Sequence, residues 1–175
     1  VRACVHDGAP SLFRRFMAGE FDREVFRFLV CDALGIPDGI PQDRFEHAFG
    51  DVFTLNADVV RGWQSLRRDF GLTVTAVSNM DPIRWQRLER MGVPPIFDHI
   101  VLSFEEKMVK PSEELMLRAR ERSGAKAEET LFVDDQAKNF PPAESLGILT
   151  HLFTDAGRLW EEIGRIGVRS PLKPV

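Results

Sequence analysis

The feature that most constrains how this chain can fold is a regular alternation of two kinds of segment over residues 72–166. Short runs rich in branched apolar side chains predict buried strands, and longer stretches with apolar residues at helical spacing predict helices. The expected strands are residues 72–77, 99–102, 130–133 and 149–153, and the expected helices are residues 82–91, 112–122, 141–146 and 156–166. Strands that alternate with helices are typical of a parallel sheet with helices on both faces, and we therefore predict an α/β fold.

The first 70 residues carry a different pattern, which predicts helices without strands. Helices are expected over residues 11–17, 22–34, 41–53 and 56–70. Asp22 and Asn56 are residue types that cap helix N-termini, and Gly71 is the type that ends a helix. Most phenylalanines of this segment are expected in the core of a small helical unit, and Cys31 is expected to be buried on the apolar side of its helix.

Charge and composition exclude several classes of protein. The chain has 175 residues, with 23 Lys and Arg against 27 Asp and Glu and a net charge of -4. This balance predicts no nucleic-acid partner and no polybasic contact with a membrane. No apolar run approaches the ~18 residues of a membrane span. Two cysteines are too few for a disulfide framework, so a reducing, cytoplasmic location is expected.

Three polar features lie at or near the ends of predicted strands, where ligands bind in open α/β sheets. Ser78 and Asn79 follow the first strand and can offer a hydroxyl and backbone N–H groups to a phosphoryl oxygen, or simply cap a helix. Lys110 stands in a loop before a helix, either as a compact charge suited to phosphate or as a solvated surface lysine. Asp134 and Asp135 follow the third strand and offer the hard oxygen ligands that suit Mg²⁺, unless they are exposed turn residues.

Taken together and in this order, these features resemble the haloacid dehalogenase-like (HAD) hydrolase superfamily, over roughly residues 10–165. The sequence Val-Thr-Ala-Val-Ser-Asn at 74–79 resembles the second motif of that family. Met-Val-Lys-Pro at 108–111 resembles its third motif, and Leu-Phe-Val-Asp-Asp at 131–135 resembles its fourth. Asn139 also matches a family Asn that precedes a helix.

The resemblance implies a Rossmann-like parallel sheet with helices on both faces, plus a small all-helical cap. The helical segment before the first predicted strand is similar to the cap that the family inserts after its own first strand. We expect this cap over residues 9–55, the HAD-like α/β core over residues 56–168 and a loose tail over residues 169–175.

The resemblance also implies roles for individual residues. Ser78 and Lys110 would be catalytic, and Asn79 would join them in binding the substrate. Asp134 and Asp135 would hold Mg²⁺ as the cofactor. An acidic pair in the fourth motif is typical of the Mg²⁺-dependent phosphatase branch, and a metal and a lysine together neutralise the charge of phosphoryl oxygens.

We therefore expect a hydrolase that removes phosphate from a small phosphomonoester through an aspartyl-phosphate, working as a monomer or homodimer. Two alternatives stay open. One is a catalytically inactive HAD-like module that binds a phosphorylated ligand or a partner. The other, weaker alternative is a 2-haloacid dehalogenase-like enzyme, which the acidic pair disfavours because breaking a carbon–halogen bond needs no cation.

The family's first motif, an apolar strand followed by Asp-x-Asp with the nucleophile, is not found in this chain. The only candidate is the segment 1–7, where Asp7 is followed two residues later by Ala9 instead of a second Asp. We therefore predict that the chain as it stands is inactive. Because it starts at Val1, we expect the intact protein to carry the nucleophile motif upstream and to be an enzyme.

Overall fold

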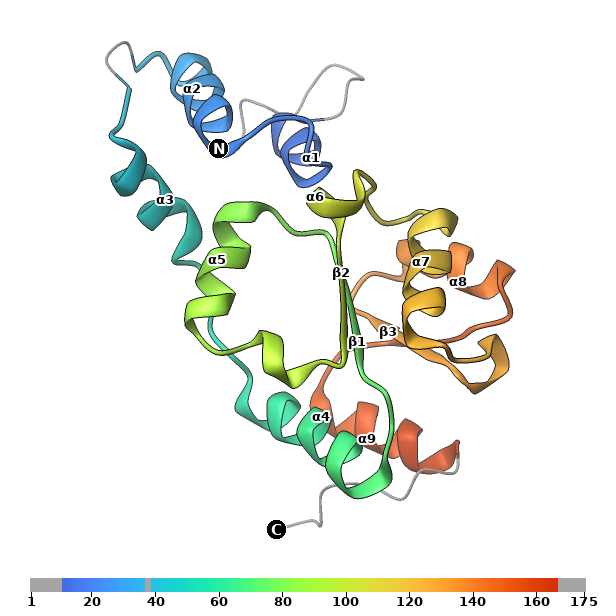
Figure 1. Ribbon diagram of the computed structural model, residues 1–175. Coiled ribbons are helices and arrows are strands. Elements are labelled where there is room, and N and C mark those ends of the chain that lie inside the picture. The colour runs from blue at the N-terminus through green and yellow to red at the C-terminus, as the bar shows by residue number, and fades with distance from the viewer. Residues whose placement is uncertain (1–10, 37–38, 167–175) are drawn as a thin grey trace. The chain divides into compact units, whose positions relative to one another are not determined.

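The computed structural model describes residues 11–36 and 39–166 (Figure 1). In chain order its elements are α1 Leu12–Met17, α2 Arg23–Ala33, α3 Gln42–Gly50, α4 Ala57–Phe70, β1 Thr75–Ser78, α5 Pro82–Arg90, η2 Pro94–Ile96, β2 His99–Leu102, α6 Ser103–Glu106, α7 Glu113–Ser123, η3 Ala127–Glu129, β3 Leu131–Asp134, η4 Ala137–Asn139, α8 Pro141–Ser145, β4 Leu149–Leu152 and α9 Ala156–Arg165. The candidate nucleophile segment 1–7 and the predicted tail 169–175 lie outside the described residues.

The helices and strands predicted between residues 11 and 166 are all present, with their ends shifted by a few residues. The side chain of Asp22 accepts a hydrogen bond from the Val25 N–H, and Asn56 caps α4 in the same way. Gly71 ends α4 with a φ of 64°, a left-handed conformation that glycine adopts without strain. α6 has no counterpart among the predicted elements, because a single turn shows too little apolar periodicity to be recognised.

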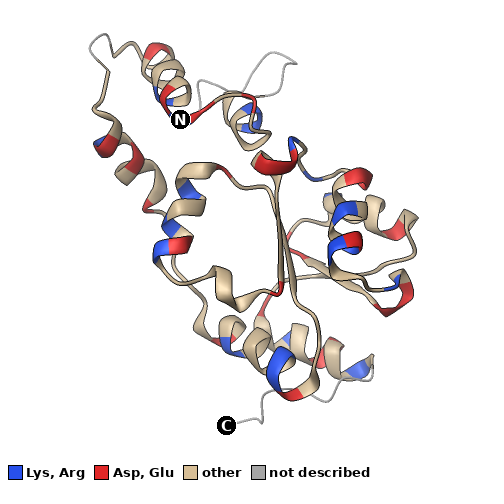
Figure 2. Cartoon of the chain, viewed as in Figure 1, with Lys and Arg blue, Asp and Glu red and all other residues tan. Residues whose placement is uncertain are grey.

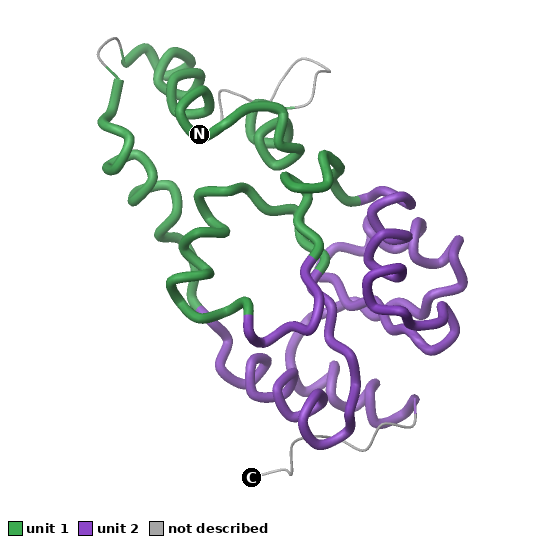
Figure 3. The backbone as a smooth tube through the Cα atoms, in the orientation of Figure 1, with its two compact units in different colours: residues 1–54, 77–94, 101–110 green, residues 55–76, 95–100, 111–175 purple. Residues whose placement is uncertain are grey.

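The chain divides into two compact units (Figure 3). The first unit consists of residues 1–54, 77–94 and 101–110, and the second unit of residues 55–76, 95–100 and 111–175. β1 and β2 each run from the second unit into the first. The first unit therefore combines the helices of the expected cap with the ends of β1 and β2 and the segments that follow them, which include α5 and α6.

The described strands form two pairs, β1 with β2 and β3 with β4. β3 and β4 are parallel, with Leu131 opposite Leu149 and Asp134 opposite Leu152. Parallel neighbours cannot be joined by a tight turn, and here the connection passes through α8. The predicted α/β class is confirmed, and Asp134 stands at the carboxyl end of its strand.

The core of the first unit is built mainly from phenylalanines. Phe16, Phe26, Phe45 and Ile83 are buried together, and the rings of Phe16 and Phe26 stack with their centroids 3.9 Å apart. Ile83 belongs to α5, so the helix that follows β1 shares its core with α1, α2 and α3. The predicted aromatic core is confirmed, and Cys31 is buried as expected.

The core of the second unit lies where α4 meets α9. Leu66, Leu159, Trp160 and Ile163 are buried together. Gly62 faces the indole of Trp160 so closely that a Cβ atom at residue 62 would overlap the ring. The absence of a side chain at this position therefore allows the two helices to pack as they do.

Most helices carry both acidic and basic side chains, so that charges of the two signs are interspersed (Figure 2). Within residues 11–36 and 39–166, no helix has the length and apolar character needed to cross a bilayer.

Candidate active site

Ser78 and Asn79 lie where β1 gives way to a short loop in the first unit. Ser78 is the last residue of β1, and Asp81 caps the following helix, α5, which begins at Pro82. Ser78 is half-buried, and its hydroxyl has no hydrogen-bond partner among the described residues. Asp81, and not Ser78, caps α5.

Lys110 lies next to Asn79 in the same unit, in the loop between α6 and α7. The Asn79 side chain donates from Nδ2 to the Lys110 carbonyl oxygen at 3.1 Å and accepts from the Lys110 N–H at 2.6 Å. The structure thus brings together the Ser-Asn and Lys-Pro motifs, which are 31 positions apart in the sequence at these two residues. Both Asn79 and Lys110 are half-buried.

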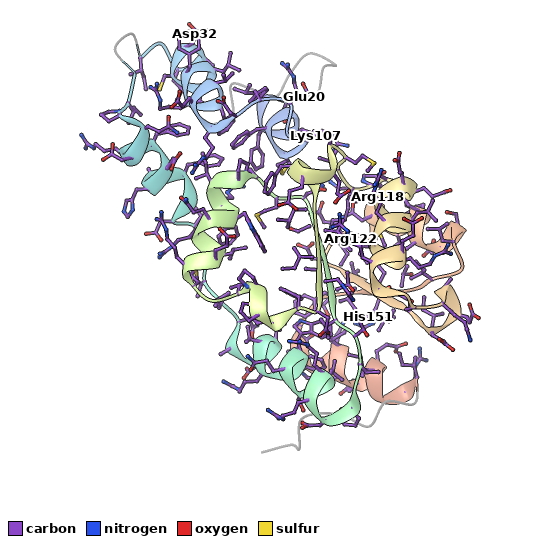
Figure 4. The ribbon with its side chains drawn as sticks, in the orientation of Figure 1. Glu20, Asp32, Lys107, Arg118, Arg122 and His151 are labelled. Atoms are coloured by element: carbon purple, nitrogen blue, oxygen red, sulfur yellow. The ribbon has the colours of Figure 1, made fainter. Side chains whose placement is uncertain are left out.

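Ser103 and Lys107 of the α6 region support this loop, and sequence reasoning missed both. The fully buried hydroxyl of Ser103 accepts from the Met80 N–H at 2.9 Å and reaches the Met17 carbonyl at 2.7 Å. Lys107 donates from Nζ to the Gly19 carbonyl oxygen at 2.7 Å, and Figure 4 shows its side chain beside Glu20. The turn between α1 and α2 is therefore tied to α6. In the sequence, Ser103 and Lys107 are ordinary polar residues between the Ser-Asn and Lys-Pro motifs, and no pattern marks them as supporting residues.

Gly19 is required at that turn for two reasons. Its φ is 65°, and a Cβ atom there would overlap the Phe104 carbonyl oxygen. A side chain would strain the backbone and force α6 away.

Asp134 ends β3 in the second unit and is held by donors from the residues that follow it. Its Oδ1 accepts from the Gln136 N–H at 2.8 Å and from Asn139 Nδ2 at 2.9 Å. Asp134 is only 7% exposed, whereas Asp135 beside it is exposed. Asn139 is buried, and its Oδ1 makes no hydrogen bond to any described residue.

These oxygens fit a hard divalent cation. A buried carboxylate, an adjacent carboxylate and an amide oxygen without a partner are the ligand types that Mg²⁺ takes, directly or through bound water. The described residues contain no cluster of three or more His, Cys, Asp or Glu, so Asp134 and Asp135 would need further oxygen ligands. The two aspartates lie in the second unit and Lys110 in the first, and their assembly into one site stays a prediction.

An ion pair between a buried carboxylate and a partly exposed arginine lies just beyond the Ser-Asn motif. Asp81 is fully buried, and its Oδ2 is 3.7 Å from a guanidinium nitrogen of Arg84. The Arg84 guanidinium carbon lies 4.6 Å from the ring centroid of Phe13 and 4.5 Å from that of Phe49. Burial raises the pKa of Asp81 above its ordinary value, although the N–H and the charge of Arg84 act in the opposite direction.

Asp81→Asn is expected to remove part of the pH dependence of stability. A raised pKa means that the folded protein binds the proton more tightly than the unfolded chain, so Asp81 lowers the free energy of unfolding as the pH rises above about 4. Asn cannot titrate, yet its Oδ1 can still cap α5. Urea unfolding over a pH series should show that the free energy of unfolding of the variant increases relative to that of the wild type as the pH rises.

Asp22→Asn is the matched control, because Asp22 caps α2 in the same way at an exposed position. A difference between Asp81→Asn and the wild type that is the same at every pH would contradict the prediction.

The fold is that of an α/β protein of the Rossmann-like class, in which ligands bind beyond the carboxyl ends of the strands. A family model described as haloacid dehalogenase-like hydrolase matches residues 5–147. The chain therefore belongs to the haloacid dehalogenase-like hydrolases.

Two curated relatives are similar over part of the chain. A glyceraldehyde 3-phosphate phosphatase of Methanocaldococcus jannaschii is 40% identical over 68 residues, which are 38% of this chain and 30% of the relative. The corresponding phosphatase of Methanopyrus kandleri is 32% identical over 85 residues, 47% of this chain and 36% of the relative. The matched segments thus span about a third of the length of these relatives.

Solved structures share the fold over most of the chain. A HAD family enzyme of Bacteroides thetaiotaomicron, in complex with magnesium and inorganic phosphate, has a TM-score of 0.76 at 24% identity and covers 86% of this chain and 79% of its own. A predicted HAD-like hydrolase of Porphyromonas gingivalis has a TM-score of 0.78 at 25% identity, covering 91% and 80%. An L-2-haloacid dehalogenase of Xanthobacter autotrophicus has a TM-score of 0.58 at 19% identity, covering 90% and 66%.

Proposed function

We propose that this HAD-like hydrolase is a Mg²⁺-dependent phosphatase of small phosphomonoesters. The observation that carries the proposal is the pairing of the Asn79 side chain with the backbone of Lys110, which brings the loop of this half-buried lysine to the Ser-Asn motif at the end of β1. A hydroxyl donor and a cation at the end of a strand suit a phosphoryl group.

Each residue has a role in this proposal. The Ser78 hydroxyl donates to a phosphoryl oxygen and orients the group. The Lys110 ammonium neutralises charge on the phosphoryl oxygens as the bond to phosphorus changes, which is where such a cation contributes most. Asp134 and Asp135 would hold Mg²⁺, which would supply positive charge to phosphoryl oxygens. Asn139 keeps the Asp134 carboxylate oriented through its Nδ2 hydrogen bond.

The curated relatives support a phosphatase and suggest the first substrate to test. Both are named glyceraldehyde 3-phosphate phosphatases, and the B. thetaiotaomicron structure holds magnesium and inorganic phosphate. We propose a small phosphorylated metabolite as the substrate, with glyceraldehyde 3-phosphate at the head of the panel.

The nucleophile is the remaining part of the proposal. In the family, the first Asp of an Asp-x-Asp motif forms an aspartyl-phosphate, and the 175 residues contain no Asp-x-Asp. We therefore propose that the 175-residue chain binds Mg²⁺ and phosphate without turnover. The catalytic test uses the protein translated from the complete reading frame, with the 175-residue chain alongside it.

The protein from the complete reading frame is expected to release inorganic phosphate from a panel of phosphomonoesters. Phosphate release should stop when Mg²⁺ is removed with EDTA and resume when Mg²⁺ is returned. The physical reason is that the phosphoryl oxygens lose the cation held by Asp134 and Asp135. Phosphate release is measured colorimetrically, and Mg²⁺ binding is measured by calorimetry on the 175-residue chain.

Asp134→Asn should abolish Mg²⁺ binding. Asp32→Asn is the control, because it makes the same change at an exposed aspartate of α2. A protein that binds Mg²⁺ and phosphate but releases none from any ester would instead be a binding module. Chloride release from a 2-haloacid without added metal would indicate a dehalogenase.

A further inference from the structure

The side chain of Asn79 pairs with both backbone polar groups of a single residue, Lys110. Nδ2 donates to the carbonyl oxygen at 3.1 Å, and Oδ1 accepts from the N–H at 2.6 Å. Two bonds to one residue define both the position of its backbone and the direction in which its Cα–Cβ bond points. The two partners also fix the orientation of the amide, since its oxygen faces a donor and its nitrogen faces an acceptor.

The pairing holds the backbone of a residue that belongs to no helix or strand. Lys110 lies between α6, which ends at Glu106, and α7, which begins at Glu113, so no helix ladder holds its N–H and carbonyl. The next residue is Pro111, which restricts the backbone of Lys110 to extended conformations. The Asn79 carboxamide adds hydrogen bonds of the kind that a neighbouring strand would supply.

We propose that Asn79 is a positioning residue that acts through Lys110 and is not itself a ligand of the phosphoryl group. Asn79 holds the Lys110 backbone and so fixes the point from which the lysine side chain extends. Groups that are placed in advance lose less entropy on binding and need less reorganisation. The inference rests on the proposed function only for the identity of the ligand.

Ser78 and Asn79 are neighbours in the sequence and have different roles: Ser78 binds the ligand, and Asn79 positions Lys110. In the proposed function, the Ser78 hydroxyl donates to the phosphoryl oxygen. The Asn79 carboxamide donates one hydrogen bond to the backbone of Lys110 and accepts one from it. The Ser-Asn pair therefore links the end of β1 to the lysine loop while presenting one hydroxyl to the ligand.

The first test measures the hydrogen bond itself on the 175-residue chain. In Asn79→Ala the Lys110 amide proton is expected to exchange with solvent about tenfold faster or more, because it loses its acceptor. Exchange is followed residue by residue by NMR. Asn56→Ala is the matched control, since Asn56 makes the same kind of side-chain bond at the N-terminus of α4. It should leave Lys110 exchange unchanged.

The second test is a double-mutant cycle on the binding of inorganic phosphate, measured by calorimetry. Asn79→Ala alone is expected to weaken binding about tenfold, and Lys110→Ala to weaken it further. When Lys110 is already Ala there is no ammonium to misplace, so adding Asn79→Ala should change the affinity by less than about twofold. If Asn79→Ala does not fold, Asn79→Ser replaces it in the same double-mutant cycle with Lys110→Ala.

The outcomes separate the two proposals. An equal loss from Asn79→Ala with and without Lys110 would show direct contact with phosphate and overturn the positioning role. Unchanged exchange of the Lys110 amide would overturn it as well. A wild-type chain that binds no phosphate would contradict the proposed function, and the exchange measurement would then decide the role of Asn79.

Discussion

Lys110→Met is expected to lower kcat for phosphate release by about 10²–10³-fold in the protein from the complete reading frame. Met keeps most of the length and apolar character of the side chain but carries no charge, so the phosphoryl oxygens lose a cation where negative charge develops. The free energy of unfolding should change little, because Lys110 is half-buried in a loop. Steady-state kinetics and urea unfolding on the same preparations measure the two effects.

Lys126→Met is the matched control, because Lys126 makes an ion pair with Glu129 at an exposed position of the second unit. Lys110→Arg should recover only part of the activity, since a planar guanidinium presents its charge differently from a compact ammonium. Full activity in Lys110→Met would remove Lys110 from the chemistry, and an equal loss in Lys126→Met would point to an effect of net charge.

Gly62→Ala is expected to lower the free energy of unfolding by about 1–3 kcal/mol, because the added methyl overlaps the indole of Trp160 in a closely packed core. The same change in an open helix raises stability, since Ala is the better helix former. Packing therefore outweighs helix propensity at this position. Urea unfolding of the variant and the wild type measures the difference.

Two further variants separate packing from the loss of glycine. Gly164→Ala lies in α9 with nothing within 4 Å of the added Cβ, so it should stabilise the protein by up to about 1 kcal/mol. In the presence of Trp160→Phe, whose shorter ring withdraws from α4, Gly62→Ala should cost about 0.5 kcal/mol or less. An undiminished cost beside Trp160→Phe would refute the steric explanation.

The sequence predicted the local structure well because its causes are local. Asp22 and Asn56 cap their helices through bonds to N–H groups two or three positions away, and Gly71 ends its helix by its own backbone conformation. The strands β2 and β3 are marked by short apolar runs between polar turns. The sequence did not predict α6, because a single helical turn shows neither a capping residue nor an apolar periodicity.

The candidate site was predictable only in part. The residue types and their order pointed to Ser78, Lys110 and the acidic pair, whose roles stay a prediction. The supporting contacts were not visible. Ser103 reaches Met17 across 86 positions, and Lys107 reaches Gly19 across 88, and no local pattern encodes such distances.

By itself, the sequence determined the class of fold, the helices and strands and the motifs that assign this chain to the haloacid dehalogenase-like hydrolases. Only the tertiary structure decided that the Asn79 carboxamide is engaged with Lys110, that Asn139 orients Asp134 and that Gly62 makes room for Trp160. The physical reason is the range of the interactions. Caps and apolar periodicity act between residues a few positions apart, whereas partners in a hydrogen bond or a packed core are chosen by how the whole chain folds.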